Sequence, residues 1–253
     1  MKSDSLVLRK CEGLEELRAC LALQKEVWNF TDIELVPLRI FVVATKVGGQ
    51  VMGAFEGKDL VGFAMAIPGF RSGHAYLYSH MLAVRKDYRN AGVGRRLKLL
   101  QREDGMARGF ALMEWTFDPL EIKNAYLNIE KLGAITRRYN ENQYGITSSP
   151  LQGGLPTDRL VAEWWFKSRR VERAIADEPK PKFEVQQTIA VPAQIYAWKA
   201  APAKREQAHG VQEKNRQVFL QSFAAGLSVL GYERDSAGNG KFLLGTWDEA
   251  WKY

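Results

Sequence analysis

The chain has 253 residues, of which 46% are hydrophobic, and its net charge is +7. This composition excludes a disordered chain, because it can bury a sizeable core, and its longest apolar runs, such as residues 40–44, are far too short to span a bilayer. Cys11 and Cys20 are nine residues apart and the three histidines are scattered, so no metal site is expected. Two thiols without an apolar leader favour a cytoplasmic protein.

Apolar periodicity predicts the elements of the first half of the chain. A short strand at 6–9 precedes an amphipathic helix at 14–28, and Pro37 opens a second helix that ends near residue 48. Three strand-like runs follow, at 51–55, 60–67 and 75–84. The second of them is expected to stop at Pro68. The pattern then predicts a helix at 93–108 and a strand at 110–117.

The second half continues with mixed elements. A helix at 122–132 is closed by Gly133, and the loop 148–156 separates two further strands. The remaining predictions, in chain order, are strands 134–139 and 159–166, a charged linker or surface excursion 167–182, a strand 185–191, a helix 203–225 and a hairpin of strands 227–232 and 242–247. Hairpins combined with a central strand–helix–strand unit indicate an α+β fold with a mixed sheet.

One segment has the pattern of a phosphate-binding turn. The apolar strand through Leu82-Ala83-Val84 leads into Arg89-Asn90-Ala91-Gly92-Val93-Gly94-Arg95 and then a basic helix. Glycines let a backbone approach a ligand closely, and the first N–H groups of a helix have no internal partner and carry partial positive charge. The segment therefore predicts a site for a pyrophosphate.

Two common nucleotide-binding motifs do not fit this segment. A Walker loop needs Gly-Lys-Ser/Thr, but Arg95 follows Gly94, and a dinucleotide fingerprint needs a glycine where Leu97 stands. Residues 85–108 hold eight basic and three acidic side chains, a local surplus of +5 (8 − 3). Such a cluster is an anion site or simply a solvated basic helix face.

The pattern Arg89-x-x-Gly92-x-Gly94 resembles motif A of the GNAT acyltransferase superfamily, (Gln/Arg)-x-x-Gly-x-(Gly/Ala). Element order agrees with that family over about residues 6–166. Further segments resemble a poorly characterised GNAT branch with a C-terminal extension: Trp115–Pro119, Asn124-Ala125, Lys131–Gly133 and Pro156–Arg159. The resemblance implies a core at 1–166, with splayed central strands, and an extension at 167–253 packed on it.

The resemblance also assigns binding roles. It implies acyl-coenzyme A as co-substrate, with its pyrophosphate on the main-chain amides of the turn and its pantetheine arm along the strand. The residues concerned are Leu82, Ala83, Val84, Arg89, Asn90, Ala91, Gly92, Val93, Gly94 and Arg95. Asn124 and Asn128, four apart on the predicted helix, are expected to reach the pantetheine amides, unless Asn124 only caps that helix.

Direct acyl transfer needs a base for the attacking amine. His80 is the first candidate, because it lies two positions from the presumed oxyanion donor, the Leu82 N–H, and its ordinary pKa suits neutral pH. The segment His80–Val84 resembles the corresponding strand of the arylalkylamine N-acetyltransferases, although Tyr78 replaces that family's other histidine. The alternative is that His80 is a core or pocket-wall histidine with a purely structural role. Glu114 is the second candidate, and Asp118 the third.

The general acid is less well defined. Many GNAT enzymes have a tyrosine four residues before the glycine of the Lys-x-Gly segment, and here that position is Ile129. Tyr126 is a nearby hydroxyl, and so is Tyr139, but neither stands at the matching position. The thiolate could also leave to solvent.

Three functions from different classes follow. The first is N-acylation of a small-molecule amine or amino acid by acetyl- or another small acyl-coenzyme A, such as succinyl-coenzyme A. The second is an acyl-coenzyme A-binding or sensing module without turnover, which Ile129 favours. The third is nucleic-acid binding by the basic cluster, against which the absence of a recognised motif argues. No nucleic-acid, membrane or metal partner is expected, and the extension could form a homodimer interface.

Overall fold

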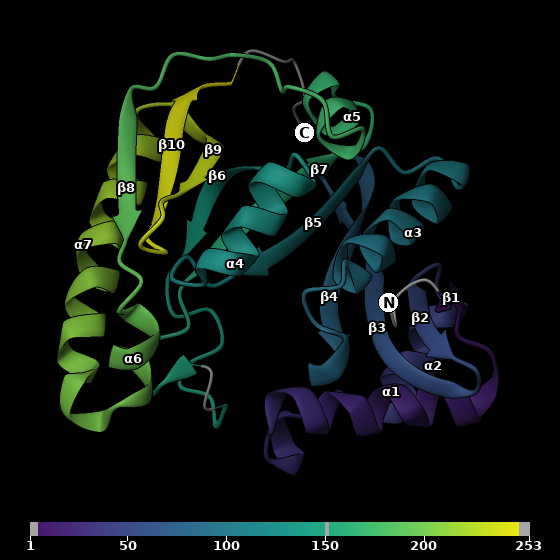
Figure 1. Ribbon diagram of the computed structural model, residues 1–253. Helices are drawn as coiled ribbons and strands as arrows, with labels where there is room; N and C mark the ends of the chain where they lie inside the picture. Colours follow the sequence, from purple (N-terminus) through teal and green to yellow (C-terminus); the bar gives the residue numbers. More distant parts are fainter. Residues whose placement is uncertain (1–4, 150–151, 248–253) are drawn as a thin grey trace. The chain divides into compact units, whose positions relative to one another are not determined.

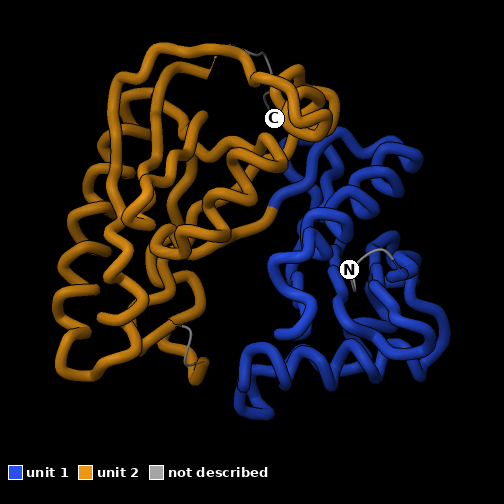
Figure 2. The backbone as a smooth tube through the Cα atoms, in the orientation of Figure 1, with its two compact units in different colours: residues 1–114, 253 blue, residues 115–252 orange. Residues whose placement is uncertain are grey.

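The computed structural model describes residues 5–149 and 152–247. The chain divides into two units, Met1–Glu114 and Trp115–Lys252 (Figure 2). The expected boundary between residues 166 and 167 falls inside the second unit, so the division into a core and an extension stays a prediction.

The first unit contains a group of strands flanked by helices (Figure 1). Its elements, in chain order, are β1 (Val7–Lys10), α1 (Gly13–Trp28), α2 (Leu38–Lys46), β2 (Gln50–Glu56), β3 (Asp59–Arg71), β4 (His74–Val84), α3 (Val93–Ala107) and the start of β5 (Leu112–Phe117). Asn29, in the left-handed region at φ 50°, ends α1 by donating its N–H to the Lys25 carbonyl. These elements agree with the predicted ones in order and type.

Strands β1 to β4 form an antiparallel meander, and β4 then pairs with β5 in parallel. The parallel register joins Leu77 to Met113 and Tyr78 to Glu114. The sheet is therefore mixed, as predicted from the sequence.

Each face of this sheet is covered by helices. On one face, Phe63 and Met65 of β3 pack with Leu17 of α1 and Phe41 of α2. On the other face, Val93 and Leu97 of α3 pack over small residues of β2 and β3, including Ala54 and Ala64. A Cβ at Gly62 would lie only 3.3 Å from Leu97 and 3.4 Å from Val93, so glycine there lets α3 approach the sheet closely.

The expected end of β3 at Pro68 is wrong, because the strand continues to Arg71. The pairing of β3 with β2 ends at Ala66, which lies opposite Gln50, and beyond Ala66 β3 pairs only with β4 within the described residues. A proline costs no ladder hydrogen bond where its strand is unpaired on one side. Pro68 therefore marks the stretch where β3 becomes an edge, rather than the end of the strand.

The second unit contains the remaining elements (Figure 1). They are α4 (Ile122–Ala125), which continues as a π-helical turn (Tyr126–Lys131), β6 (Ile135–Asn140), β7 (Arg159–Trp165), α5 (Arg169–Ile175), β8 (Gln187–Val191), α6 (Ile195–Ala200), α7 (Arg205–Ala224), β9 (Leu227–Arg234) and β10 (Gly240–Thr246). Strand order within this unit is β5-β7-β6-β9-β10-β8.

The C-terminal helix and hairpin are integrated into this unit. Strand β9 pairs antiparallel with β6 at Thr136 and Val229, and β10 pairs with both β9 and β8. Phe219 of α7 is fully buried, with its ring 5.2 Å from that of Phe242 and 5.7 Å from that of Tyr139. The predicted α+β class, with a C-terminal helix and β-hairpin, is confirmed.

Two predicted segments of the second unit need correction. The expected linker 167–182 contains α5, which begins where the Ser168 hydroxyl accepts a hydrogen bond from the Val171 N–H, at 3.3 Å. The sequence does not indicate this helix clearly, because its buried apolar residues Val171 and Ala174 stand between charged residues. The expected single helix at 122–132 changes from α to π at Tyr126, and α6 was not predicted.

A buried carboxylate fixes the strand–loop–helix junction of the second unit. Asp158 is fully buried, and its Oδ2 accepts from Tyr139 Oη at 2.7 Å and from Arg216 Nε at 2.8 Å. Its Oδ1 accepts from the Asn142 N–H at 3.0 Å. Burial and the hydrogen bond to Asp158 raise the pKa of the Tyr139 phenol.

Tyr139→Phe is therefore expected to lower the free energy of unfolding by about 1.5–3 kcal/mol, the usual range for a hydrogen bond to a charged group. Urea denaturation at constant pH measures the change. Tyr144→Phe is the matched control, because its exposed hydroxyl lies 3.4 Å from Thr116 Oγ1 and should matter little. Equal stability of the two variants would contradict the assigned role of Tyr139.

Candidate functional site

The segment between β4 and α3 forms a tight turn at the start of a helix. A 3-10 turn (Lys86–Tyr88) leaves β4, and Asn90 and Gly92 then adopt positive φ angles of 62° and 76°. Gly92 is the N-cap of α3, whose first intrahelical hydrogen bond runs from the Arg96 N–H to the Gly92 carbonyl, at 3.0 Å. The amides of Val93 and Gly94 thus belong to the first turn, which carries the positive end of the helix dipole.

The space in front of this turn is open. A Cβ added at Gly92 would meet no heavy atom of the described residues within 4 Å, and one at Gly94 would meet only Leu82 Cδ2, at 3.6 Å. Gly92 is required by its backbone conformation, whereas no described neighbour requires glycine at position 94. The Arg89 side chain stabilises the turn from behind, with Nε donating to the Val84 carbonyl at 3.0 Å.

The strand that leads into the turn is anchored from both faces of the sheet. Ala83 is buried in the cluster under α1 and α2, while Leu82 and Val84 are partly buried against α3. Ala91 and Asn90 are exposed. The strand, turn and helix predicted to hold the coenzyme thus lie together in the first unit.

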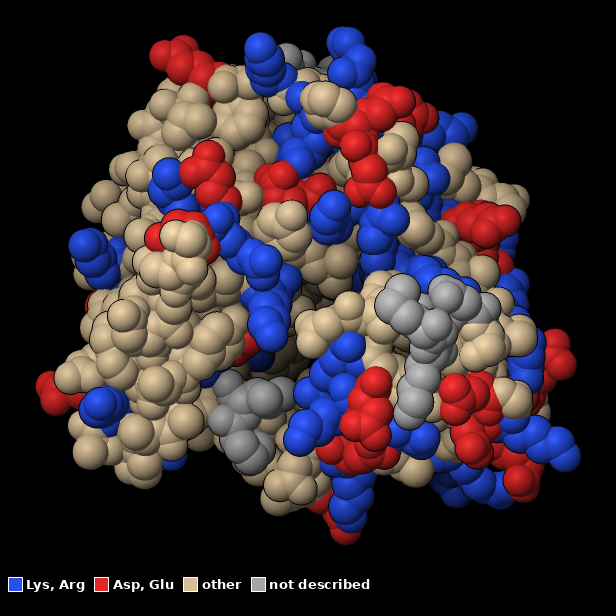
Figure 3. Space-filling model, viewed as in Figure 1, with Lys and Arg blue, Asp and Glu red and all other residues tan. Residues whose placement is uncertain are grey.

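The basic cluster is partly used by the fold. Lys98 is buried, Arg96 donates to the Leu6 carbonyl at 3.2 Å, and Arg108 pairs with Asp104 at 2.7 Å. Figure 3 shows basic side chains interspersed with acidic ones over the visible face of the first unit. The +5 surplus of the sequence is therefore not an unbroken basic surface on that face.

His80 occupies an irregular position in β4. Met81 pairs with Met65 and Ser79 with Ala66, so His80 is the extra residue of a β-bulge. Bulges re-aim side chains and are frequent beside active sites. The imidazole is exposed, with its centroid 6.4 Å from that of the Tyr78 ring. Partial desolvation by the surrounding protein lowers the pKa of His80 below its ordinary 6.5, which favours the neutral, proton-accepting form.

Glu114 is held by an arginine that sequence reasoning missed. Its side chain is 2% exposed, and its two oxygens accept from Arg71 Nη2 at 2.5 Å and Nη1 at 3.0 Å. The Arg71 guanidinium also lies 4.9 Å from the centroid of the Tyr76 ring. The two charged residues are 43 apart in sequence, so no local pattern could have joined them.

If the chain catalyses the acyl transfer that the resemblance implies, Glu114→Gln is expected to retain at least about a third of the wild-type rate, because both carboxylate oxygens are already occupied by Arg71 rather than presented to a substrate proton. Steady-state thioester cleavage at about pH 7.5 measures this. Arg71→Lys, which breaks the two-pronged geometry but keeps the charge, is the companion variant. A loss above about 100-fold in Glu114→Gln alone would instead identify Glu114 as the base.

The other predicted site residues belong to the second unit. Asn124 is exposed, whereas Asn128 is buried and its carbonyl accepts from the Ala134 N–H at 3.0 Å, so the two do not share an environment. The Tyr126 ring lies 4.6 Å from the Arg234 guanidinium. Ile129, in the position of the family tyrosine, is fully buried.

Asp118, the third base candidate, has structural partners. Its Oδ1 accepts from the Leu120 N–H at 2.8 Å, the geometry of an Asx turn, and its Oδ2 accepts from Lys199 Nζ at 2.9 Å. Lys199 also pairs with Glu121 at 2.8 Å. The opposite charges of Asp118 and Glu121 raise the pKa of Lys199 despite its burial, which by itself would lower it.

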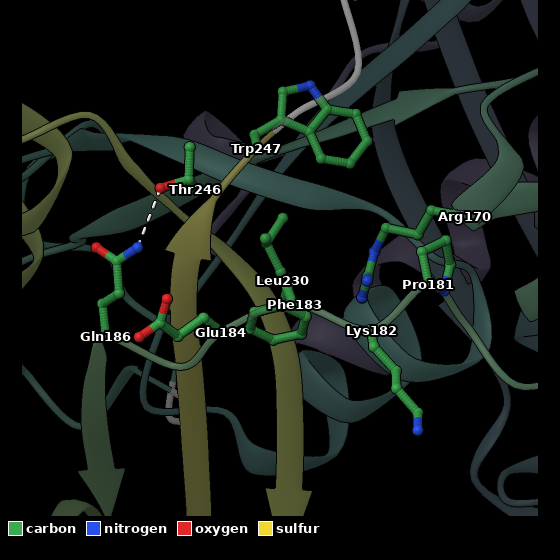
Figure 4. A pocket seen from close by; sticks show the side chains of 9 residues that line it. All are labelled: Arg170, Pro181, Lys182, Phe183, Glu184, Gln186, Leu230, Thr246 and Trp247. Atoms are coloured by element: carbon green, nitrogen blue, oxygen red, sulfur yellow. Dashed lines mark hydrogen bonds between the residues drawn. The ribbon is translucent and has the colours of Figure 1, made fainter.

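A cavity of about 270 Å³ lies in the second unit, and none of the predicted site residues lines it. Figure 4 shows Arg170 and Lys182 on one side, Glu184 and Gln186 on the other and Trp247 above. Gln186 Nε2 donates to Thr246 Oγ1 at 3.1 Å. The predicted loop 148–156 lies partly outside the described residues, because residues 150 and 151 are not described.

Neither a metal centre nor a membrane span is found in the described residues. Within residues 5–149 and 152–247, no cluster of three or more His, Cys, Asp or Glu side chains could hold a metal ion. No helix in the same ranges is long and apolar enough to cross a membrane.

Comparison with known proteins relates this geometry to a family. Residues 14–123 match the model of the acetyltransferase (GNAT) family. The fold is similar to that of the ribosomal-protein-S18-alanine N-acetyltransferase of Escherichia coli, at 15% identity and a TM-score of 0.52, covering 64% of this chain and 95% of that one. An N-acetyltransferase of Staphylococcus aureus Mu50 gives 16% identity, a TM-score of 0.52 and coverage of 64% and 99%.

A third structure was solved with a ligand. A Salmonella typhimurium protein, solved with acetyl-coenzyme A as its cofactor, gives 14% identity, a TM-score of 0.53 and coverage of 65% and 95%. No curated protein matches the sequence.

Fold and motif agree with one family. Over residues 14–123 the chain carries a GNAT acetyltransferase domain, as its motif A indicated. The family match supports acyl transfer as the general chemistry of this domain.

Proposed function

We propose that the protein is an N-acyltransferase that moves an acetyl or other small acyl group from acyl-coenzyme A to the amine of a small molecule or amino acid. The observation that carries this proposal is the open turn at Gly92 and Gly94, which follows a strand bearing an exposed histidine on a bulge. In this proposal the amides of the turn bind the coenzyme diphosphate, and Leu82 to Val84 align its pantetheine arm.

The proposed reaction is a direct attack. His80 accepts the proton that the acceptor amine must lose, so that its nitrogen can form a bond to the thioester carbonyl. The Leu82 N–H donates to the oxyanion that develops. As the carbon–sulfur bond breaks, the thiolate takes a proton from solvent or from Tyr126, giving free coenzyme A and an amide.

The acceptor is proposed to be a small amine. The Escherichia coli neighbour acts on an alanine of ribosomal protein S18, so a protein N-terminus is the other acceptor class to compare. Thioester cleavage with acetyl- and succinyl-coenzyme A, against a panel of amines, amino acids and an alanine-ended peptide, identifies both the acyl group and the acceptor. We propose neither a nucleic-acid nor a membrane partner, and analytical ultracentrifugation would test for a homodimer.

One observation favours a second function, an acyl-coenzyme A sensor without turnover. The position of the family's tyrosine holds Ile129, which is fully buried and cannot donate a proton. Calorimetry and thioester cleavage separate the two functions. Micromolar binding with release of coenzyme A supports the enzyme, binding without release for any amine supports the sensor, and no binding at all would overturn both.

A further inference from the structure

Beneath the bulge of β4, the side chains of α3 build a buried polar network that a helix–sheet interface does not need for packing. Its members are Ser79 of β4, Lys98 and Gln101 of α3, and Gln50 of β2, and none is more than 4% exposed. Buried polar groups are costly unless they hydrogen-bond, so such a network normally fixes a specific geometry.

The contacts of Ser79 determine its orientation fully. Lys98 Nζ donates to Ser79 Oγ at 2.7 Å, and the same hydroxyl donates to Gln101 Oε1 at 3.0 Å. Gln50 Nε2 then donates to the Gln101 carbonyl and to Asp104 Oδ2, both at 2.8 Å. The hydroxyl thus accepts one hydrogen bond and donates another, each with a different residue of α3.

Ser79 is also the residue directly before the bulge. It is the last β4 residue in register with Ala66 before His80 interrupts the pairing with β3. An extra strand residue is unpaired by nature, so its conformation depends on what holds the residues beside it. Here that anchor is α3, the same helix whose first turn carries Gly92 and Gly94.

We propose that Ser79 and Lys98 are positioning residues: they lock the β4 bulge onto α3 and so aim the His80 imidazole relative to the turn at Gly94. The proposal rests on the proposed function in assigning His80 a reactive role. It also explains why a lysine lies on the buried face of α3, next to the apolar Val93 and Leu97. Desolvation lowers the pKa of Lys98 well below its ordinary value, in keeping with a structural donor rather than a surface cation.

The first experiment follows the His80 imidazole directly, without any substrate. The chain has only three histidines, so His74→Gln and His209→Gln variants assign the His80 Cε1–H signal by NMR. In Ser79→Ala and in Lys98→Met, His80 should reach solvent more freely, and its titration midpoint should move upward towards about 6.5. Ser79→Thr keeps the hydroxyl and should keep the wild-type midpoint.

The second experiment measures turnover. Ser79→Ala is expected to lower kcat about tenfold, because small misplacements of a reacting group reduce rates strongly, while KM for acyl-coenzyme A stays within about twofold. Ser79→Thr should restore kcat. Ser228→Ala, another buried serine on a strand but outside the network, is the control and should match wild type in both measurements.

The outcomes separate the two hypotheses. Unchanged His80 titration in both Ser79→Ala and Lys98→Met would overturn the positioning role, as would an equal shift in Ser228→Ala. If wild-type protein transfers no acyl group to any amine, the proposed function fails, but the NMR comparison still decides whether the network aims His80.

Discussion

Gly94→Asp is expected to bind acyl-coenzyme A at least about tenfold more weakly than the wild-type protein, with no loss of stability. A Cβ at this position would meet only Leu82 Cδ2, at an ordinary contact distance of 3.6 Å, and a carboxylate is favourable in the first turn of a helix. Its negative charge would, however, repel the diphosphate that we propose to bind the amides of the first turn of α3. A tenfold change corresponds to about 1.4 kcal/mol of binding free energy.

Gly210→Asp provides the matched control for this prediction. Gly210 lies inside α7, and a Cβ there would meet no described atom within 4 Å. Isothermal titration calorimetry should show weaker binding of acyl-coenzyme A for Gly94→Asp alone. Wild-type affinity in that variant would mean that the ligand does not approach this turn.

His80→Ala is expected to lower kcat/KM by about 10²–10⁴-fold, the usual contribution of a general base. Binding of acyl-coenzyme A should stay unchanged, since the imidazole lies outside the turn. His209→Ala removes an exposed histidine of α7 and is the control. Full activity in His80→Ala would assign the imidazole a structural role instead.

The pH profile tests the same residue independently. The pKa of His80 is lowered because desolvation disfavours the charged imidazolium, so the neutral base predominates at every pH above about 6.5. Activity should therefore decline only when the pH falls below about 6.5, and the acidic limb of kcat/KM should lie on the low side of that value. This limb should vanish in His80→Ala, while the limb set by the amine substrate remains.

The features that sequence reasoning predicted well were those with local causes. Glycine spacing, helical periodicity and a preceding apolar strand are all encoded within a few residues, and so the strand, turn and helix from Leu82 to Arg95 lie as expected. The C-terminal hairpin has an equally local cause, because Asp235 accepts from the Asn239 N–H at 2.9 Å to close its turn.

The features that were missed depend on distant partners. Arg71 meets Glu114 only because β3 folds back on β4 and β4 pairs with β5. The network of Ser79 and Lys98 requires α3 to cross the sheet under the bulge, although a lysine on an otherwise apolar helix face was a usable signal. Helix α5 was not predicted because Arg170 is buried in the structure, whereas an arginine is assigned to the solvent face when a helical pattern is sought in the sequence.

The section of β3 beyond Ala66 has a consequence for the behaviour of the protein in concentrated solution. In the part of the chain that the structure describes, these residues have a strand on one side only, and an open row of backbone donors and acceptors invites pairing with another chain. Pro68 withholds one of the donors that such an intruding strand would need. A residue that looked like a signal to stop the strand is better understood as protection of an exposed border against fibril-like association.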